Sequence, residues 1–339
     1  MRSMMFTRRA TLASLAGLAL SALPLRAQDL KKVTVALDWT PNTNHIGLFV
    51  ARDKDFYREA GIDVEILPYS DTSAATLVAN RVADFGVLGS IGLFTQHTAG
   101  ADLVATYAVV QTETGRLVFK GDRADIRSPK DLDGRTYGGF GSAWENALIG
   151  SLIRHDGGKG EFETITLGTS AYQALENGAV DFTLEVYTWE GVKAELEGVR
   201  QGAFRYADYG VPDEHTTLIG SSDAFLRDRP ADAAAFMKAT RRGYEFAVDH
   251  PDEAVDLMIA ANRDALTDRG LVRASLQALI DGHYFRTDNG IIGRIDPAKM
   301  EAIGSYLFKA EILNDAYGKP VSRKPDFAGY FTNDLLEAP

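Results

Sequence analysis

KVTVALDWTPNTNHIGLFVARDKDFYREAGIDVEILPY, residues 32–69, contains two predicted strands and one predicted helix. Apolar and polar side chains alternate over residues 32–38, which is the pattern of a half-buried strand. Residues 46–60 are expected to form a helix that ends at Gly61, and residues 63–69 a second strand. A strand, a helix and a strand in this order predict parallel strands joined by a crossover helix.

The alternation of strands and helices continues along the chain. We expect further strands at 84–88, 103–110, 136–138, 164–167 and 181–185, and further helices at 72–80, 91–99, 143–154, 172–177 and 190–197. Asp71 and Ser90 are the expected N-caps of the helices that follow them. From residue 223 onward we expect mainly helices, at 231–248, 251–260, 269–284 and 297–309. These patterns predict an α/β fold with largely parallel sheets.

Two short segments resemble each other. Residues 77–85, LVANRVADF, match residues 174–182, ALENGAVDF, and in each an Asp-Phe pair opens a predicted strand after a helix and a small loop. Two interpretations are open. The similarity is either a chance likeness of two loops or the trace of two lobes built on one plan.

Length, composition and charge exclude several classes of protein. The 339 residues suit about two packed α/β units. The absence of cysteine excludes a disulfide framework, a thiol nucleophile and cysteine-ligated metal sites. The formal net charge is −11, and an acidic surface repels phosphate backbones, so we expect no nucleic acid partner.

Common catalytic and metal-binding motifs are absent from the sequence. It contains no phosphate-binding loop motif, no Gly-x-Ser-x-Gly and no His-Glu-x-x-His. Its six histidines form no pair with metal-ligand spacing. We therefore expect no metal and no cofactor.

The first 27 residues have the layout of an export signal. A short basic segment, residues 1–9, precedes a small-residue apolar stretch, residues 10–23, and a suitable cleavage point follows. Arg8 and Arg9 resemble the twin-arginine export motif, so general secretion and twin-arginine export are both open. The sequence predicts a signal peptide over residues 1–27 and a mature protein that works in the periplasm.

Polar and aromatic side chains follow the first predicted strand. Asp38, Trp39, Asn44 and His45 lie in this segment. Ligands of open parallel sheets bind outside the carboxyl ends of the strands, so we expect these residues to bind a ligand. The alternative is a turn in which Asn44 only caps the next helix.

The ends of other strands provide further candidates. The same rule selects Ser90, Trp144, Glu145, Tyr187 and Glu190 as ligand-binding residues, and it draws attention to segments 111–113 and 185–191. Tryptophan and tyrosine beside carboxylates suit a flat heteroaromatic ring that carries amino groups. The alternative for Glu190 is that it only stabilises the start of a helix.

The sequence resembles a known family of transport proteins. The segments ALDWTPNTNHIGLFV (36–50), GIDVE (61–65), SPKDLDG (128–134) and WEG (189–191) are similar to the thiamine-pyrimidine-precursor branch of ABC-transporter substrate-binding proteins. That branch is related to sulfonate binders and to the fungal thiamine-pyrimidine synthase. The likeness extends over about residues 32–310.

The resemblance implies a fold, a ligand and a partner. The fold would be an α/β, two-lobed type II periplasmic-binding-protein fold, with mixed, mostly parallel sheets and a hinge. Lobe 1 would comprise residues 28–120 plus 216–339 and lobe 2 residues 121–215, with hinge strands at 117–120 and 216–221. The protein would be a monomer that captures an aminopyrimidine of the formylaminopyrimidine or hydroxymethylpyrimidine type and passes it to an ABC permease in the inner membrane.

The resemblance also assigns roles and leaves alternatives. It gives ring stacking to Trp39 and the contact with the aminopyrimidine to Glu190. One alternative is an enzyme, because the related synthase makes the pyrimidine from its own histidine and pyridoxal phosphate, with a cysteine-rich iron site. This chain has no cysteine, and residues 88–92, LGSIG, stand where we align the lysine and histidine of the synthase. A receptor for another flat heterocycle such as riboflavin is the other alternative.

Overall fold

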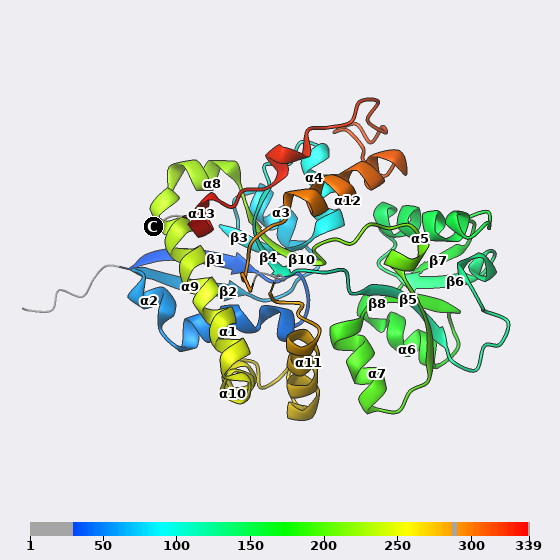
Figure 1. Cartoon of the computed structure of the whole chain (residues 1–339), viewed down its shortest axis with the longest axis horizontal. Coiled ribbons are helices and arrows are strands. Elements are labelled where there is room, and N and C mark those ends of the chain that lie inside the picture. Colours follow the sequence, from blue (N-terminus) through cyan, green and yellow to red (C-terminus); the bar gives the residue numbers. More distant parts are fainter. Residues whose placement is uncertain (1–29, 287–289, 338–339) are drawn as a thin grey trace, which may run out of the picture.

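Two separate β-sheets, each covered by helices, form the body of the protein (Figure 1). The computed structural model describes residues 30–286 and 290–337. The predicted signal peptide, residues 1–27, lies outside the described residues. We call each sheet with its helices a lobe; the first lobe lies to the left and the second to the right in Figure 1.

The first lobe contains a five-stranded mixed sheet. Its strands are β1 (Lys31–Ala36), β2 (Ile62–Leu67), β3 (Phe85–Gly89), β4 (Val104–Val110) and β10 (Thr217–Ser221), in the order β2-β1-β3-β10-β4. The pairs of β1 with β2 and with β3 are parallel, as the sequence predicted, whereas β10 runs antiparallel to β3 and β4. The helices of this part are α1 (Ile46–Asp53), α2 (Phe56–Glu59), α3 (Ala74–Ala79), α4 (Ser90–Thr98), α8 (Asp223–Asp228), α9 (Pro230–Asp249), α10 (Pro251–Ala261), α11 (Arg269–Asp281), α12 (Pro297–Lys309) and α13 (Asp334–Glu337).

The second lobe repeats this arrangement. Its strands are β5 (Gly115–Lys120), β6 (Thr136–Gly139), β7 (Glu163–Thr166), β8 (Phe182–Val186) and β9 (Gln201–Arg205), in the order β7-β6-β8-β5-β9. Here β5 is the antiparallel strand, paired with β8 and β9. The helices are α5 (Ala143–His155), α6 (Ala171–Glu176) and α7 (Val192–Leu196), and a π-helical turn, Tyr187–Gly191, precedes α7.

The similar segments 77–85 and 174–182 occupy equivalent places in the two sheets. Oδ2 of Asp84 accepts a hydrogen bond from the backbone N–H of Thr34 on β1, at 2.8 Å. Oδ2 of Asp181 accepts one from the N–H of Thr136 on β6, at 3.0 Å. Each aspartate thus joins the start of one strand, β3 or β8, to the neighbouring parallel strand of its own sheet, β1 or β6. The shared contact and strand order favour two lobes built on one plan.

The chain crosses between the lobes at two short segments, which differ from the strands that we expected. The expected hinge strands 117–120 and 216–221 lie almost entirely inside sheets, in β5 and β10. The expected boundary at residue 120 is therefore wrong, because β5 already belongs to the second sheet. A strand between lobes and a strand inside a sheet have the same sequence pattern, so the pattern alone could not separate them.

The crossing segments, residues 111–114 and 211–216, are hydrogen-bonded to each other. Oγ1 of Thr216 accepts from the N–H of Thr114 and donates to the carbonyl of Thr112, both at 2.9 Å. The N–H of Glu113 donates to Oδ1 of Asp213, at 2.9 Å. The two crossings therefore form one connected hinge region.

Several predicted helix ends need correction. The helix expected at 46–60 is divided into α1 and α2, because Asp55 between them has a positive φ of 59°. Ser73, not Asp71, caps α3, and its Oγ accepts from the N–H of Thr76. Ser90 does not cap α4 either, because it is the first residue of that helix and Gly89 holds the cap position. The four C-terminal helices begin and end within three residues of their predicted limits.

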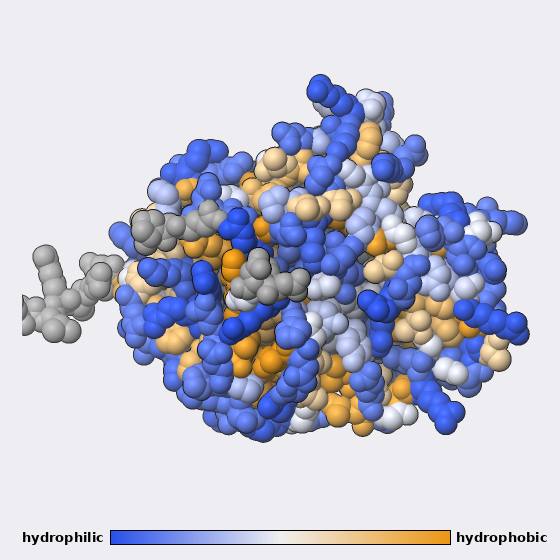
Figure 2. All heavy atoms as spheres, viewed as in Figure 1, coloured by the Kyte–Doolittle hydropathy of each residue, from blue (hydrophilic) through white to orange (hydrophobic). Residues whose placement is uncertain are grey.

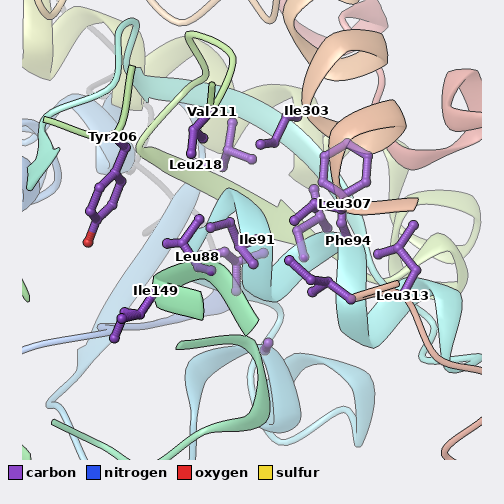
Figure 3. Close-up of a cluster of buried hydrophobic side chains, with 14 of the residues drawn as sticks. Leu88, Ile91, Phe94, Ile149, Tyr206, Val211, Leu218, Ile303, Leu307 and Leu313 are labelled. Atoms are coloured by element: carbon purple, nitrogen blue, oxygen red, sulfur yellow. The ribbon is translucent and has the colours of Figure 1, made fainter. Parts of the chain in front are cut away.

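Two large buried clusters hold the molecule together, and a third, small one lies in the second lobe around Val118, Leu175 and Val180. In the first lobe, helices α1 and α9 approach so closely that a Cβ on Gly243 would lie 2.0 Å from the carbonyl oxygen of Gly47. A second cluster, part of which Figure 3 shows, joins Leu88 and Ile91 of the first lobe to Ile149 of the second and to Leu307 of α12. The lobes therefore share apolar contacts as well as the hinge.

Polar and charged side chains cover most of the face drawn in Figure 2, with smaller apolar areas between them. Among residues 30–286 and 290–337, no helix is both long and apolar enough to cross a membrane.

Candidate functional site

A cavity of about 430 Å³ lies between the two sheets. From the first lobe, the segments that follow β1 and β3 line it; from the second, the end of β8 and the π-helical turn do so, and both crossing segments contribute. This is the position that ligands of open α/β sheets occupy, outside the carboxyl ends of the strands. The cavity is therefore the candidate binding site.

Six of the nine predicted site residues line this cavity. They are Asp38, Trp39, Asn44, Ser90, Trp144 and Glu190. The first four come from the first lobe and the last two from the second. The structure thus brings together residues that lie up to 152 positions apart in the sequence.

His45 does not line the cavity, and its position corrects our prediction. The ring is fully buried, and its Nδ1 accepts a hydrogen bond from the N–H of Asn42 at 3.3 Å. Its Nε2 lies 2.8 Å from Oδ1 of Asp38 and donates to it, because the other ring nitrogen is an acceptor. His45 therefore orients the Asp38 carboxylate that faces the cavity.

Glu145 is a structural residue of the second lobe, not a lining residue as expected. Its carboxylate accepts from the hydroxyl of Tyr137 at 3.1 Å and from the N–H of Phe140 at 3.2 Å. It also accepts from the N–H and Oγ of Ser142, at 2.8 and 2.9 Å, which completes a capping box at the start of α5. Glu145 thereby fixes the loop that carries Phe140.

Tyr187 faces a second, smaller cavity of about 190 Å³, which also contradicts its predicted role. The guanidinium of Arg116 lies 4.6 Å from the centre of its ring. Asn44 keeps its predicted place in the cavity wall and does not cap α1. Asn42 caps the 3-10 turn Thr43–His45 that precedes α1, by accepting from the N–H of Asn44 at 2.9 Å. The Asn44 amide instead donates to Oγ1 of Thr217, at 3.4 Å.

Aromatic rings form much of the cavity wall. The rings that line it are Trp39, Tyr69, Phe140, Trp144, Tyr172, Trp189 and Tyr206. The indole of Trp39 lies 5.6 Å from the ring of Tyr69 and 5.1 Å from that of Phe140, measured between centroids. Such a wall suits a flat, unsaturated ligand, which gains from stacking and from burial.

The polar part of the wall is acidic. Its carboxyl groups belong to Asp38, Asp71, Glu113, Glu185, Glu190 and Glu214, whereas no lysine, arginine or histidine is among the lining residues of the described chain. An anionic ligand would meet repulsion here, and a ligand that donates hydrogen bonds or carries positive charge would be favoured. The wall therefore selects for N–H groups.

Glu190 lies on the π-helical turn, half-buried in the wall. Its Oε2 accepts a long bond of 3.4 Å from the N–H of Val186. Burial raises the pKa of Glu190 to about 7, and the neighbouring Glu185 adds to the increase. At neutral pH this carboxyl group therefore exchanges between its charged and neutral forms, so that it can accept one hydrogen bond and either give or accept a second.

Four lining carboxyl groups are missing from the predicted site: Asp71, which we expected only as a helix cap, Glu113, Glu185 and Glu214. The rule that ligands bind outside the carboxyl ends of strands points to the segments that contain Glu113 and Glu185. Glu185 is buried, and the guanidinium of Arg116 donates to its Oε1 at 2.5 Å. Glu214 lies just before a strand, so no sequence signal marks it.

These features define a two-lobed α/β protein of the periplasmic-binding-protein fold with a cavity between its lobes. The chain belongs to the NMT1/THI5-like family, whose model matches residues 42–254. It is 26% identical to the formylaminopyrimidine-binding protein of Halalkalibacterium halodurans, over 83% of this chain and 86% of that one. It is 24% identical to the 4-amino-5-hydroxymethyl-2-methylpyrimidine phosphate synthase THI13 of Saccharomyces cerevisiae, over 66% of this chain and 69% of that one.

The fold also resembles that of solved binding proteins. For the periplasmic aliphatic sulphonate binding protein SsuA from Escherichia coli, the TM-score is 0.63. The two sequences are 16% identical, and the match covers 88% of this chain and 91% of that chain. Relatives of this chain thus include binding proteins and synthases.

The residues of this chain do not fit the pyridoxal phosphate and iron that resemblance to the synthases implies. No lysine lines the cavity to form a Schiff base, and the segment Leu88–Gly92 supplies only backbone, aliphatic groups and the Ser90 hydroxyl. The chain has no cysteine, and the described residues contain no cluster of three or more potential metal ligands.

Proposed function

We propose that this protein is the periplasmic receptor of an ABC importer and captures a thiamine-type aminopyrimidine between its lobes. The observation that carries the proposal is a cavity between two lobes whose wall contains both aromatic rings and the carboxyl group of Glu190. The name of the H. halodurans relative supports the same class of ligand. A formylaminopyrimidine or a hydroxymethylpyrimidine would fit this description.

The chemistry of an aminopyrimidine complements the wall. Its exocyclic amino group donates hydrogen bonds, and the adjacent ring nitrogen either accepts a proton or carries one. One carboxyl group can serve both atoms, which is the role that we give to Glu190. The indole of Trp39 would cover one face of the ring, and the wall excludes water around it.

We further propose that the two lobes move about the crossing segments 111–114 and 211–216. A ligand that contacts Trp39 in the first lobe and Glu190 in the second binds best when the lobes are closed. The closed form would then dock as a monomer on a permease in the inner membrane. An export signal in residues 1–27 would deliver the protein to that compartment.

A receptor is favoured over a synthase because of the groups that the cavity offers. Catalysis through pyridoxal phosphate uses an amine that forms a Schiff base, and the lining residues supply none. Binding and release require no such group. We therefore propose that the chain carries no cofactor and catalyses no reaction.

Thermal unfolding of the purified protein tests the proposal. We expect 4-amino-5-hydroxymethyl-2-methylpyrimidine to raise the melting temperature without iron or pyridoxal phosphate. At a ligand concentration 100 times Kd, the stabilisation is about 2.7 kcal/mol, which gives a clear shift. Stabilisation by riboflavin and not by the pyrimidine would instead favour a receptor for another heterocycle. Formation of a pyrimidine from pyridoxal phosphate would contradict the proposal.

A further inference from the structure

A tyrosine hydroxyl without a partner lies at the wall of the cavity. Tyr206 lines the cavity and begins the 3-10 turn Tyr206–Tyr209, which follows β9. The residue is only 6% exposed, and among the described residues its hydroxyl has no hydrogen-bond partner. Protein does not enclose this oxygen as it encloses the unpartnered hydroxyl of Tyr107. The Tyr206 hydroxyl is therefore open to a cavity and free to bond to a ligand.

The hydroxyl lies on the side of the larger cavity, although the ring of Tyr206 also borders the smaller one. Figure 3 shows the hydroxyl pointing away from the apolar side chains of Val211 and Ile303. Burial raises the pKa of Tyr206 well above its ordinary value, and nearby carboxyl groups add to the increase. Two of these, Glu185 and Glu214, line the larger cavity and not the smaller. The hydroxyl thus stays protonated and can donate a hydrogen bond there.

Close packing fixes the ring of Tyr206 near the hinge. A Cβ on Gly115 would lie 2.5 Å from Cε2 of this ring, so only glycine leaves room for it. Gly115 is the first residue of β5 and directly follows the crossing segment 111–114. Phe140, which contacts Trp39, is 38% exposed and marks the open end of the cavity. Tyr206 therefore lies at the hinge end of the cavity, with its ring held in one place.

Other neutral donors of the wall are already used within the protein. A protein oxygen atom accepts a hydrogen bond from each of the side chains of Asn42, Asn44, Ser90 and Thr216. The hydroxyl of Tyr172 also lines the cavity without a partner among the described residues, but Tyr172 is less buried than Tyr206. Charged carboxylates only accept hydrogen bonds. Tyr206 is therefore the best placed donor for an acceptor atom of the ligand.

We propose that Tyr206 determines specificity by donating a hydrogen bond to an uncharged oxygen atom on a short arm of the aminopyrimidine. The hydroxyl of a hydroxymethyl arm and the carbonyl of a formylaminomethyl arm both provide such an acceptor. This inference rests on the proposed function and extends it from the ring to the arm. The ring lies against Trp39 and Glu190, and the arm reaches the hinge end of the cavity.

This contact selects for the oxygen atom of the arm. A site that hydrogen-bonds one group of its ligand binds analogues without that group less tightly, because a buried polar atom is then left unpaired. A ligand with a plain methyl arm would keep the ring contacts and leave the Tyr206 hydroxyl without a partner. The affinity should therefore depend on the arm in a way that Tyr206 controls.

Calorimetric titration with three ligands of one scaffold tests this inference. The ligands are 4-amino-2-methylpyrimidines that carry at position 5 a hydroxymethyl, a formylaminomethyl or a methyl group. Wild-type protein should bind each oxygen-bearing compound about 3- to 10-fold more tightly than the methyl compound. Tyr206→Phe should remove this preference and change the affinity for the methyl compound by less than about twofold. Its melting temperature without ligand should equal that of wild type, because the hydroxyl has no protein partner to lose.

Two further variants locate the effect. Tyr209→Phe removes a hydroxyl from the same turn but outside the cavity wall, so it should leave all three affinities unchanged. Tyr172→Phe removes the other unpartnered hydroxyl and should keep the preference for the oxygen-bearing arms. Loss of the preference in Tyr172→Phe, with its retention in Tyr206→Phe, would assign the contact to Tyr172 and contradict the inference.

The remaining outcomes separate this inference from the proposed function. If Tyr206→Phe weakens all three ligands equally, or none of them, the contact with the arm is wrong and the aminopyrimidine receptor stands. The same holds if wild-type protein binds the methyl compound as tightly as the other two, which decides the inference even if a variant fails to fold. If none of the three compounds binds to wild-type protein, both proposals are wrong.

Discussion

The rings of Trp39 and Phe140 meet edge to face across the cavity, with centroids 5.1 Å apart and planes inclined by 69°. Trp39 follows β1 of the first lobe, and Phe140 follows β6, the strand that holds the equivalent place in the second sheet. Phe140 is 38% exposed, so this contact lies at the rim of the cavity. The two lobes therefore touch where a ligand would enter or leave.

Replacing Phe140 should speed ligand release. Phe140→Ala removes the contact between the lobes and an aromatic interaction of about 0.5–1.5 kcal/mol, so the dissociation rate should rise about 2- to 10-fold. The melting temperature without ligand should change little, because the side chain is exposed. Stopped-flow fluorescence of Trp39 and its neighbours measures the rate. Ile165→Ala, at an exposed position of β7, is the control; an equal effect there would contradict the role of the rim.

Trp39→Ala should weaken binding more strongly than Phe140→Ala. It removes the stacking surface together with buried apolar area, and we expect a loss of at least about tenfold in affinity. Trp39→Phe should recover part of the loss, because a phenyl ring still covers the ligand. Calorimetric titration measures both variants. Wild-type affinity in Trp39→Ala would show that the ring binds elsewhere in the cavity.

The affinity of wild-type protein should decrease at alkaline pH. Burial raises the pKa of Glu190 to about 7. In the proposed complex, the Glu190 carboxyl group and the ring nitrogen of the aminopyrimidine together hold one proton. Below pH 7 Glu190 already carries this proton. Above pH 7 binding must take it from solution, so the affinity should fall by up to tenfold per pH unit. Titrations from pH 6 to 9, in two buffers with different ionisation enthalpies, measure both the decrease and the proton uptake.

Glu190→Gln separates the proton from the shape of the side chain. The amide can offer one acceptor and one donor to the ring, but it cannot carry charge, so affinity should fall about tenfold near pH 7. The decrease between pH 7 and 9 should disappear. If the variant kept the wild-type affinity at every pH and only its melting temperature fell, Glu190 would stabilise the π-helical turn and would not bind the ligand.

Ser275 on α11 connects the segment that follows β1 to the π-helical turn of the second lobe. Its hydroxyl lies 2.5 Å from Oγ1 of Thr43 and donates to the carbonyl of Thr188, two residues before Glu190 in the turn. Figure 1 shows α11 between α10 and α7. Ser275→Ala leaves buried polar groups without partners, so unfolding free energy should fall by about 1–3 kcal/mol and ligand affinity should fall with it.

A matched exposed serine controls for the Ser275 prediction. Ser305 on α12 donates to Oε1 of Glu301 at the surface. Ser305→Ala should measurably change neither the free energy of unfolding nor the ligand affinity. Loss of stability in Ser275→Ala with unchanged affinity would show that α11 supports the fold but not the position of Glu190.

The rule that ligands bind outside the carboxyl ends of strands predicted those cavity residues that directly follow a strand in the sequence. Trp39 and Glu190 follow strands and line the cavity, because parallel strands bring their carboxyl ends to one edge. Glu145 also follows a strand, but Ser142 and Glu145 form the Ser-x-x-Glu pattern of a capping box, and that signal was present in the sequence. That pattern predicts a structural role for Glu145 and not a place in the cavity wall.

Other residues could not be placed from the sequence. Glu214 lines the cavity because the chain returns from the second lobe at that point, and only the tertiary fold brings it beside Ser90. The antiparallel places of β5 and β10 are hidden for the same reason, because strand direction leaves no mark on side-chain alternation. His45 was predicted to bind the ligand, but its buried ring instead holds Asp38.

The most direct test of the account is to identify the small molecule that the protein binds in its own compartment. The protein is produced with its natural first 27 residues, purified without denaturation and unfolded, and the released molecules are analysed by mass spectrometry. The account predicts a 4-aminopyrimidine in near-stoichiometric amount, which should disappear in Trp39→Ala. A flavin, a sulphonate or another anion in that amount would contradict it.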